Sequence, residues 1–149
     1  LKRLNSNLLL LYTGIQRNAD AVASNYVHKL SNEKEKNIRK IISNVELGEK
    51  MIKSGNINDF GKLLHHAWME KKELSKSISN HKIDELYKSS IQNGARGGKL
   101  LGAGGGGFLL VYINKEKQKN FLSKIKNITN IPFKFSNEGC DVILNSLNK

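Results

Sequence analysis

The sequence predicts an α+β fold, a two-layer sandwich in which helices cover one face of a mainly antiparallel sheet. Three observations predict it. A short apolar run lies near the start, amphipathic helical patterns fill residues 32–94, and apolar or aromatic runs separated by glycine-rich turns follow residue 99. The 149 residues, 38% of them hydrophobic, suffice for the core of one domain.

The first predicted elements are a buried strand at Leu8–Tyr12 and a helix over residues 32–54. Gly55 follows the helix and suits a left-handed C-terminal cap. The helix repeats apolar residues at steps of three and four, which predicts one inward face. That face comprises Ile38, Ile41, Ile42, Val45 and Ile52.

A second helix is predicted to begin at Asn58 or Asp59 and to lie antiparallel to the first, because a short polar turn joins them. Its apolar stripe is Leu63, Leu64, Ala67, Trp68 and Leu74. A third amphipathic helix is predicted from Asn80 to about Gly94, with Ile83, Leu86, Tyr87 and Ile91 on its apolar side.

The remaining chain predicts two strands around a glycine loop, then a fourth helix opening at Asn114 or Lys115. That helix directs Phe121, Leu122 and Ile125 inward. A strand is expected over residues 133–136 after Pro132, where a missing N–H donor is tolerated. A turn at 137–139 then leads to a hairpin partner at 141–145.

The glycine loop is the most informative stretch of the sequence. It comprises Gly102, Ala103, Gly104, Gly105, Gly106 and Gly107. Glycine accepts positive φ and has no Cβ, so such a loop can turn N–H groups inward toward another backbone or a phosphate. A dinucleotide-binding loop requires a helix next, and a P-loop requires Gly-Lys-Ser/Thr; neither follows here. A flexible linker is disfavoured because buried strands flank the loop.

The sequence GARGGKLLGAGGGGF at residues 94–108 resembles the C-terminal motif of the GHMP small-molecule kinases, and IDELY at 83–87 resembles the segment leading into it. The runs YTGIQRNA at 12–19 and HHAWMEKKELS at 65–75 resemble the sugar-kinase branch, heptose 7-phosphate kinases first and fucokinase-type enzymes next. The matches extend over about residues 8–142. The resemblance implies a ferredoxin-like arrangement.

The family's ATP-phosphate loop, a Pro-x-x-x-Gly-Leu-Gly-Ser-Ser-Ala run, is not found in this sequence, whose one proline is Pro132. We therefore expect residues 1–149 to form the C-terminal domain of a kinase, with the N-terminal domain as its partner. The resemblance implies that the other half supplies the ATP-phosphate loop, the groups that bind Mg²⁺ and the acid that activates the hydroxyl. No catalytic residue is expected in this chain, and alone it should be inactive.

The implied reaction transfers the γ-phosphate of ATP to the anomeric hydroxyl of a sugar or sugar phosphate, with D-glycero-D-manno-heptose 7-phosphate the first candidate substrate. The backbone of residues 102–107 would bind the nucleotide. Substrate contacts would come from Arg17, as a bidentate phosphate clamp, and from His65, Trp68 and Lys72 on one helix face. Each has a structural alternative: a surface ion pair or a cap on a strand end for Arg17, a core position for Trp68 and a structural hydrogen bond for His65. Lys72 and the neighbouring Lys71 are most simply solvated charges.

No metal site is expected in this chain, because His65 and His66 point about 100° apart on a helix and no third ligand has suitable spacing. The net charge of +12 comes from lysines scattered along the chain. We rank a general lysine bias first, an anionic small substrate second and nucleic acid third, since aromatic residues are only 7%.

Two rivals to a kinase domain remain: a basic nucleic-acid-binding module and a regulatory small-ligand domain. No apolar run approaches the roughly 18 residues of a membrane span, and no signal-peptide pattern opens the sequence. The single cysteine, Cys140, favours a reducing compartment, so we expect a cytoplasmic protein.

Overall fold

The computed structural model describes residues 1–27 and 34–136. The elements before the glycine loop are α1 (Lys2–Ser6), β1 (Leu8–Tyr12), α2 (Ala19–Val27), α3 (Glu35–Ser54), α4 (Phe60–Lys72), the 3-10 helix η1 (Lys76–Ile78), α5 (His81–Gln92) and β2 (Gly97–Leu100). The elements after it are β3 (Phe108–Tyr112), η2 (Lys115–Lys117), α6 (Gln118–Lys124) and β4 (Thr129–Ile131). The turn and hairpin partner predicted at 137–139 and 141–145 lie outside the described residues.

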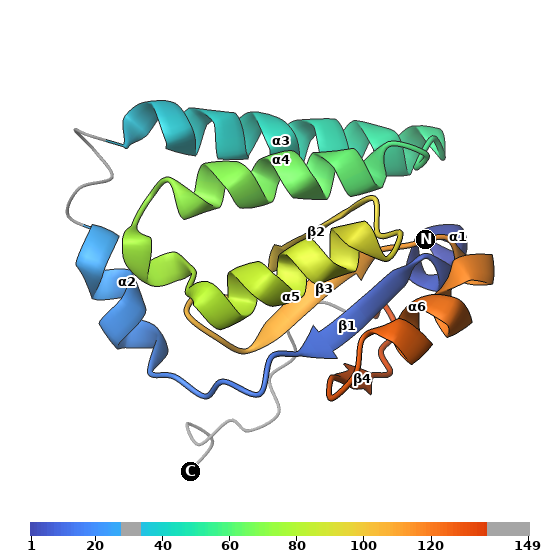
Figure 1. The fold of residues 1–149 in the computed structure, drawn as a ribbon. Helices are drawn as coiled ribbons and strands as arrows, with labels where there is room; N and C mark the ends of the chain where they lie inside the picture. The colour runs from blue at the N-terminus through green and yellow to red at the C-terminus, as the bar shows by residue number, and fades with distance from the viewer. Residues whose placement is uncertain (28–33, 137–149) are drawn as a thin grey trace, which may run out of the picture.

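The described strands form one antiparallel sheet in the order β2-β3-β1-β4. Helices connect β1 to β2 and β3 to β4, which gives the β-α-β-β-α-β connectivity of ferredoxin-like folds. In the central pair, Leu8 of β1 lies opposite Tyr112 of β3 and Leu10 opposite Leu110. Figure 1 shows α4 and α5 together over one face of this sheet. The predicted α+β class and ferredoxin-like arrangement are confirmed.

The last strand differs from the prediction. The sequence predicted a strand at 133–136, but β4 comprises Thr129–Ile131 and pairs with β1, with Ile131 opposite Leu10. Pro132 has no N–H to donate to a ladder, so pairing ends before the proline rather than beginning after it.

The short helix α2 was not predicted. Its start carries a cap that the sequence does display, because the side-chain oxygen of Asn18 accepts a hydrogen bond from the N–H of Asp20 at 2.9 Å. Asparagine is among the preferred residues at this position. Asn18 is therefore a local signal for the start of α2, and the same residue type is equally common in turns.

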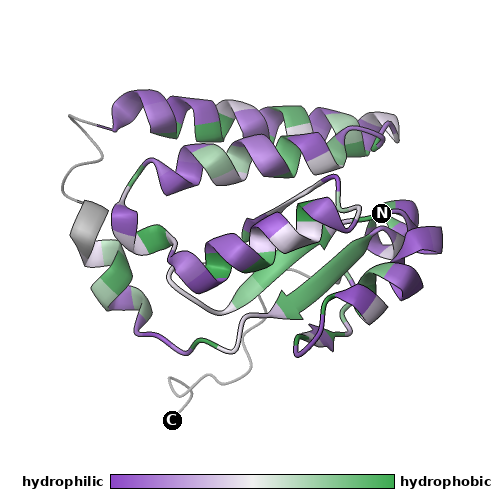
Figure 2. Cartoon of the chain, viewed as in Figure 1, coloured by the Kyte–Doolittle hydropathy of each residue, from purple (hydrophilic) through white to green (hydrophobic). Residues whose placement is uncertain are grey.

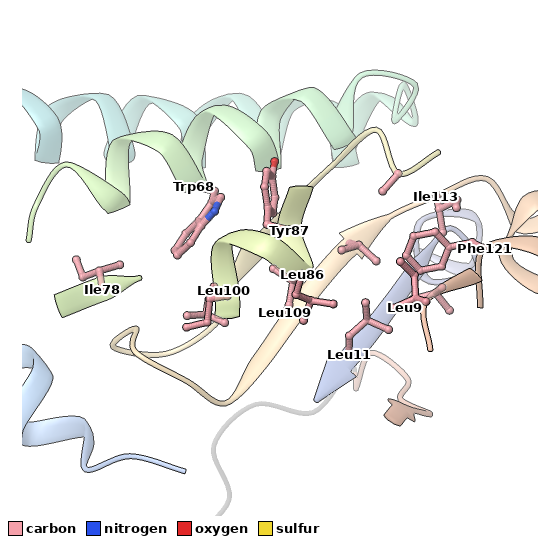
Figure 3. Close-up of a cluster of buried hydrophobic side chains, with 14 of the residues drawn as sticks. Leu9, Leu11, Trp68, Ile78, Leu86, Tyr87, Leu100, Leu109, Ile113 and Phe121 are labelled. Atoms are coloured by element: carbon pink, nitrogen blue, oxygen red, sulfur yellow. The ribbon is translucent and has the colours of Figure 1, made fainter. Parts of the chain in front are cut away.

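The core lies between the sheet and the helices α4 and α5 (Figure 3). Large side chains with 0% exposure come from both layers, such as Trp68 from α4, Ile83 from α5, and Leu11 and Leu109 from the strands. Phe121 of α6 closes the other end of this layer and is also fully buried. Burying such side chains is the main favourable contribution to folding.

Helix α3 lies antiparallel to α4, as predicted, but only part of its apolar face is covered. Ile38 and Ile41 pack against the core, whereas Ile42 and Val45 are 53% and 67% exposed. Ile52, also predicted to face inward, is 39% exposed. The reason is that α3 packs on α4 and not on the sheet (Figures 1 and 2). The apolar stripe of α3 is wide enough to contact two elements, and α4 alone covers only part of it.

Within the described ranges no helix combines the length and apolar character needed to cross a bilayer.

Helix α4 contacts strand β2 at a point where each of the two elements carries a glycine. A Cβ built on Gly97 of β2 would lie 1.8 Å from the backbone oxygen of Gly61 in α4. A Cβ on Gly61 would lie 2.7 Å from the Cβ of Arg96. The helix and the strand therefore approach closely enough that neither glycine can carry a side chain.

This contact predicts a large difference between two glycine substitutions. Gly97→Ala should lower the free energy of unfolding of the 149-residue chain by about 3 kcal/mol, because helix and strand must separate. Gly55→Ala is the control, since nothing lies within 4 Å of its added Cβ and only its φ of +72° is strained. That strain costs about 1 kcal/mol. Urea unfolding of both variants measures the difference, and equal losses would contradict the close contact.

Candidate functional site

The glycine loop, residues 102–107, connects the end of β2 to the start of β3. Four of its glycines have φ values that L side chains rarely adopt: Gly102 (69°), Gly104 (110°), Gly105 (75°) and Gly107 (88°). The composition of the loop is therefore a consequence of its backbone path.

Two segments from elsewhere in the chain hold the loop in place. The N–H of Gly105 donates to the carbonyl oxygen of Ile78 in η1 at 2.8 Å, and the N–H of Gly107 donates to that of Ile15 at 3.0 Å. The Gly107 carbonyl accepts from the N–H of Thr13 at 2.9 Å. Such fixed geometry excludes a flexible linker.

The packing around the loop leaves no space for side chains at two further positions. A Cβ on Gly104 would lie 2.8 Å from the Cα of Ile78, and one on Gly106 would lie 2.6 Å from the carbonyl oxygen of Ile15. The loop thus lies pressed between η1 and the segment that follows β1.

These hydrogen bonds reduce the number of loop N–H groups that could point toward a ligand, as the sequence predicted them to do. The N–H groups of Gly105 and Gly107 are occupied within the protein. The N–H groups of Gly102, Ala103, Gly104 and Gly106 have no hydrogen-bond partner within residues 1–27 and 34–136. Gly102 is exposed and Ala103 is half-buried, whereas Gly104 and Gly106 are buried against η1 and the segment after β1. Of the six residues expected to bind a nucleotide, Gly102 and Ala103 therefore combine an unpartnered N–H group with an accessible position.

Arg17 is the one predicted substrate residue that the structure places against the loop. Its Nη2 lies 3.1 Å from the Cβ position of Gly102 and its Cδ 3.5 Å from that of Gly105. Its Nε is buried without a hydrogen-bond partner, and no carboxylate among the described residues pairs with the guanidinium. The ion pair considered as the structural alternative for Arg17 is therefore not formed within the described chain.

A hollow of about 380 Å³ opens beside Arg17. Its other lining residues are Tyr12, Ile15, Gln16, Gly107 and Phe108. The rings of Tyr12 and Phe108 lie 5.4 Å apart between centroids. The hollow therefore lies between an aromatic pair at the ends of the two central strands, the last residue of the glycine loop and the positive charge of Arg17.

Lys71 was expected to be solvated, but it is buried beneath the loop with 9% exposure. Its Nζ donates to the carbonyl oxygen of Leu100 at 3.0 Å and also to that of Gly102. Burial, followed by the positive charges of Lys99 and Arg17, lowers the pKa of Lys71 from 10.5 to about 8. Burial likewise lowers the pKa of Lys99.

The sequence did contain a signal for Lys71. It lies three positions after Trp68 and four after Ala67, both fully or almost fully buried, so it continues the apolar stripe of α4. A lysine on a buried stripe must find acceptors for its ammonium group.

Two other predicted substrate residues lie elsewhere. Trp68 has no exposed surface, and its ring belongs to the core. The predicted stacking of Trp68 on a sugar is therefore not supported, and the structural alternative describes it better. Lys72 pairs with Asp84 at 2.6 Å, and its Nζ lies 5.9 Å from the centroid of the Trp68 ring.

His65 lies at the opposite end of β2 from the glycine loop, since its Cβ is 3.1 Å from the Cβ position of Gly97. Its Nδ1 is 2.6 Å from the hydroxyl oxygen of Tyr87, and the two rings stack with centroids 6.0 Å apart. Burial, then the neighbouring His66, lowers the pKa of His65. This is a structural arrangement; contact of His65 or Lys72 with a substrate stays a prediction.

In the described part of the chain, no three His, Cys, Asp or Glu side chains lie together in a way that could hold a metal ion.

Comparison with known proteins bears directly on this site. Residues 49–129 match the family model described as GHMP kinases C terminal. The chain is 30% identical over 143 residues to the D-glycero-alpha-D-manno-heptose 7-phosphate kinase of Campylobacter jejuni, covering 91% of this chain and 41% of that protein. It is 30% identical over 134 residues to the bifunctional fucokinase/GDP-fucose pyrophosphorylase of Arabidopsis thaliana, covering 85% of this chain and 12% of that protein. The chain spans less than half the length of both.

Solved structures agree on the fold. The mevalonate kinase of Methanococcus jannaschii superposes with a TM-score of 0.65 at 30% identity, over 87% of this chain and 40% of that one. The L. major mevalonate kinase in complex with R-mevalonate superposes with a TM-score of 0.67 at 19% identity, over 83% of this chain and 40% of that one.

The buried ammonium of Lys71 makes the stability of the chain depend on pH. Between pH 8 and 10.5 the unfolded chain retains a proton on Lys71 that the folded chain has lost. The free energy of unfolding should therefore rise with pH across this range, by about 3 kcal/mol from this residue.

Urea unfolding between pH 7 and 10.5 should show a smaller rise in Lys71→Met than in the unchanged chain. Lys88→Met, on the exposed side of α5, is the control and should retain the full rise; equal slopes in all three proteins would contradict the shift.

Proposed function

The chain belongs to the GHMP kinase family, whose members are phosphotransferases, and from this premise we propose that it is the C-terminal domain of an ATP-dependent sugar kinase. The proposed reaction moves the γ-phosphate of ATP to the anomeric hydroxyl of a sugar or sugar phosphate. The first candidate acceptor is D-glycero-D-manno-heptose 7-phosphate, and the second is a fucose-like sugar.

The observation that carries this proposal is the guanidinium of Arg17, which lies against the glycine loop and has no carboxylate partner among the described residues. Phosphoryl transfer needs donors and positive charge around phosphate oxygens more than it needs covalent chemistry by the protein. A guanidinium binds two phosphate oxygens at once, and oriented backbone N–H groups bind others. An arginine left without a carboxylate partner is suited to an anionic ligand rather than to a structural ion pair.

The residues present fit ATP in part. The N–H groups of Gly102 and Ala103 have no partner among the described residues and would donate to phosphate oxygens. Mg²⁺ requires oxygen ligands such as carboxylates, and no carboxylate of the described residues hydrogen-bonds to the loop. We therefore propose that the ligands of Mg²⁺ and the acid that activates the acceptor hydroxyl belong to the N-terminal domain, which is the proposed partner of this chain.

The proposed acceptor rests on two supports. Relatives at 30% identity are named as a heptose 7-phosphate kinase and a fucokinase. The guanidinium of Arg17 lines a hollow beside the loop and has no carboxylate partner among the described residues, which favours an acceptor that itself carries a phosphate. We further propose a cytoplasmic location, which the single cysteine supports.

Substitution of Arg17 tests the acceptor. In the full-length protein that contains this chain, Arg17→Met should raise KM for heptose 7-phosphate by about 10- to 100-fold, the effect of losing a charged hydrogen-bonding group. KM for the unphosphorylated heptose should change little. Arg39→Met, on the exposed surface of α3, is the control. Coupled kinase assays with both sugars measure the ratio, and an equal change for the two would show that Arg17 does not bind the acceptor phosphate.

A second test concerns the division of the site between two domains. The 149-residue chain alone should show no phosphorylation of any sugar in a panel and only weak nucleotide binding, since the proposed ATP-phosphate loop is not part of it. Product formation is followed with labelled ATP, and the full-length protein is the positive control. Robust turnover by the chain alone would defeat the proposed division.

A further inference from the structure

We propose that Lys71 is a positioning residue of this site: its ammonium binds the carbonyl oxygens of Leu100 and Gly102 and thereby fixes the direction of the first peptide groups of the glycine loop. The consequence for catalysis rests on the proposed kinase function, whereas the consequence for the loop does not.

The geometry places one charge at the junction of strand and loop. Leu100 is the last residue of β2, and Gly102 is the first residue of the loop. Lys71 reaches both carbonyl oxygens from the last turn of α4. The ammonium therefore couples the helix to the point where the chain leaves the sheet.

Because the peptide bond is planar, the hydrogen bond from Lys71 to the Gly102 carbonyl also sets the direction of the Ala103 N–H. In a trans peptide the carbonyl oxygen and the next N–H point in opposite directions. Because the Gly102 carbonyl is held toward Lys71, the N–H of Ala103 points away from Lys71. That N–H has no partner among the described residues. Lys71 thus directs an available donor of the loop without meeting a ligand itself.

The stability of the fold does not explain why position 71 carries a charged side chain. A buried ammonium is costly to desolvate, and an apolar side chain of similar length would fill the same space without that cost. No carboxylate in the described ranges pairs with Lys71. The charged groups that face it, Lys99 from β2 and Arg17 from the segment after β1, are both positive. A lysine in these surroundings is understandable if its ammonium is needed by the loop carbonyls.

The test compares three variants of the full-length protein: Lys71→Met, which is neutral; Lys71→Arg, which keeps the charge; and Lys88→Met as the surface control. Hydrogen–deuterium exchange of the ligand-free protein at pH 7 reports on the peptide covering residues 101–107. Exchange there should be about tenfold faster in Lys71→Met, the effect expected from losing charged hydrogen bonds. It should be near the unchanged rate in Lys71→Arg and Lys88→Met, while exchange in β1 is unchanged in all three.

Kinase assays form the second part of the test. Lys71→Met should lower kcat about tenfold or more, and Lys71→Arg should restore much of it, with KM for the sugar nearly constant. If Lys71→Met fails to fold, Lys71→Gln provides the neutral variant. Equal loop exchange in the neutral and charged variants would overturn the proposal. Faster loop exchange in a protein that phosphorylates no sugar would support the role of Lys71 and reject the proposed kinase function instead.

Discussion

The absence of side chains on the glycine loop is the constraint on which the site depends. Gly104 lies against Ile78 and Gly106 against Ile15 at distances that a Cβ would not allow. These contacts bring the segment after β1 and the segment before α5 to the same loop. Arg17 is then carried to the loop by its proximity to Ile15. A bulkier loop would separate the three segments, so the site and the local fold have the same cause.

The burial of Lys71 lowers the stability of its ammonium but places that ammonium where it can orient the loop. Burial lowers the pKa of Lys71 from 10.5 to about 8, so folding makes the ammonium less favourable, but the group is still mostly protonated at pH 7. The same burial brings the ammonium within hydrogen-bonding distance of two carbonyl oxygens that end β2 and open the loop. Functional sites commonly contain groups whose charge is held at some cost to stability.

Apolar periodicity predicted the elements that pack on the core, including β1, α4 and α5, and the resemblance of residues 94–108 predicted the topology. Apolar periodicity did not predict features that depend on polar residues or on contacts between segments distant in sequence. Strand β4 contains Thr129 and Asn130, both exposed, so no alternation marked it. The partners of the Gly105 and Gly107 N–H groups are Ile78 and Ile15, which no local pattern could identify. Lys71 was misjudged because lysine is usually solvated.

The charge distribution among the described residues supports the proposal that this chain supplies one part of a site shared with another domain. Arg17, Lys71 and Lys99 lie near the loop, and the described residues supply no carboxylate to it. A site that held only an ammonium, a guanidinium and backbone donors would bind anions but would have no group to accept a proton from a hydroxyl. Because the chain covers 41% of the C. jejuni heptose 7-phosphate kinase that it resembles, the complementary acidic groups have a natural source in the remaining length. The lack of a carboxylate at the loop among the described residues and the partial coverage of the relatives both support the proposed division of the site between two domains.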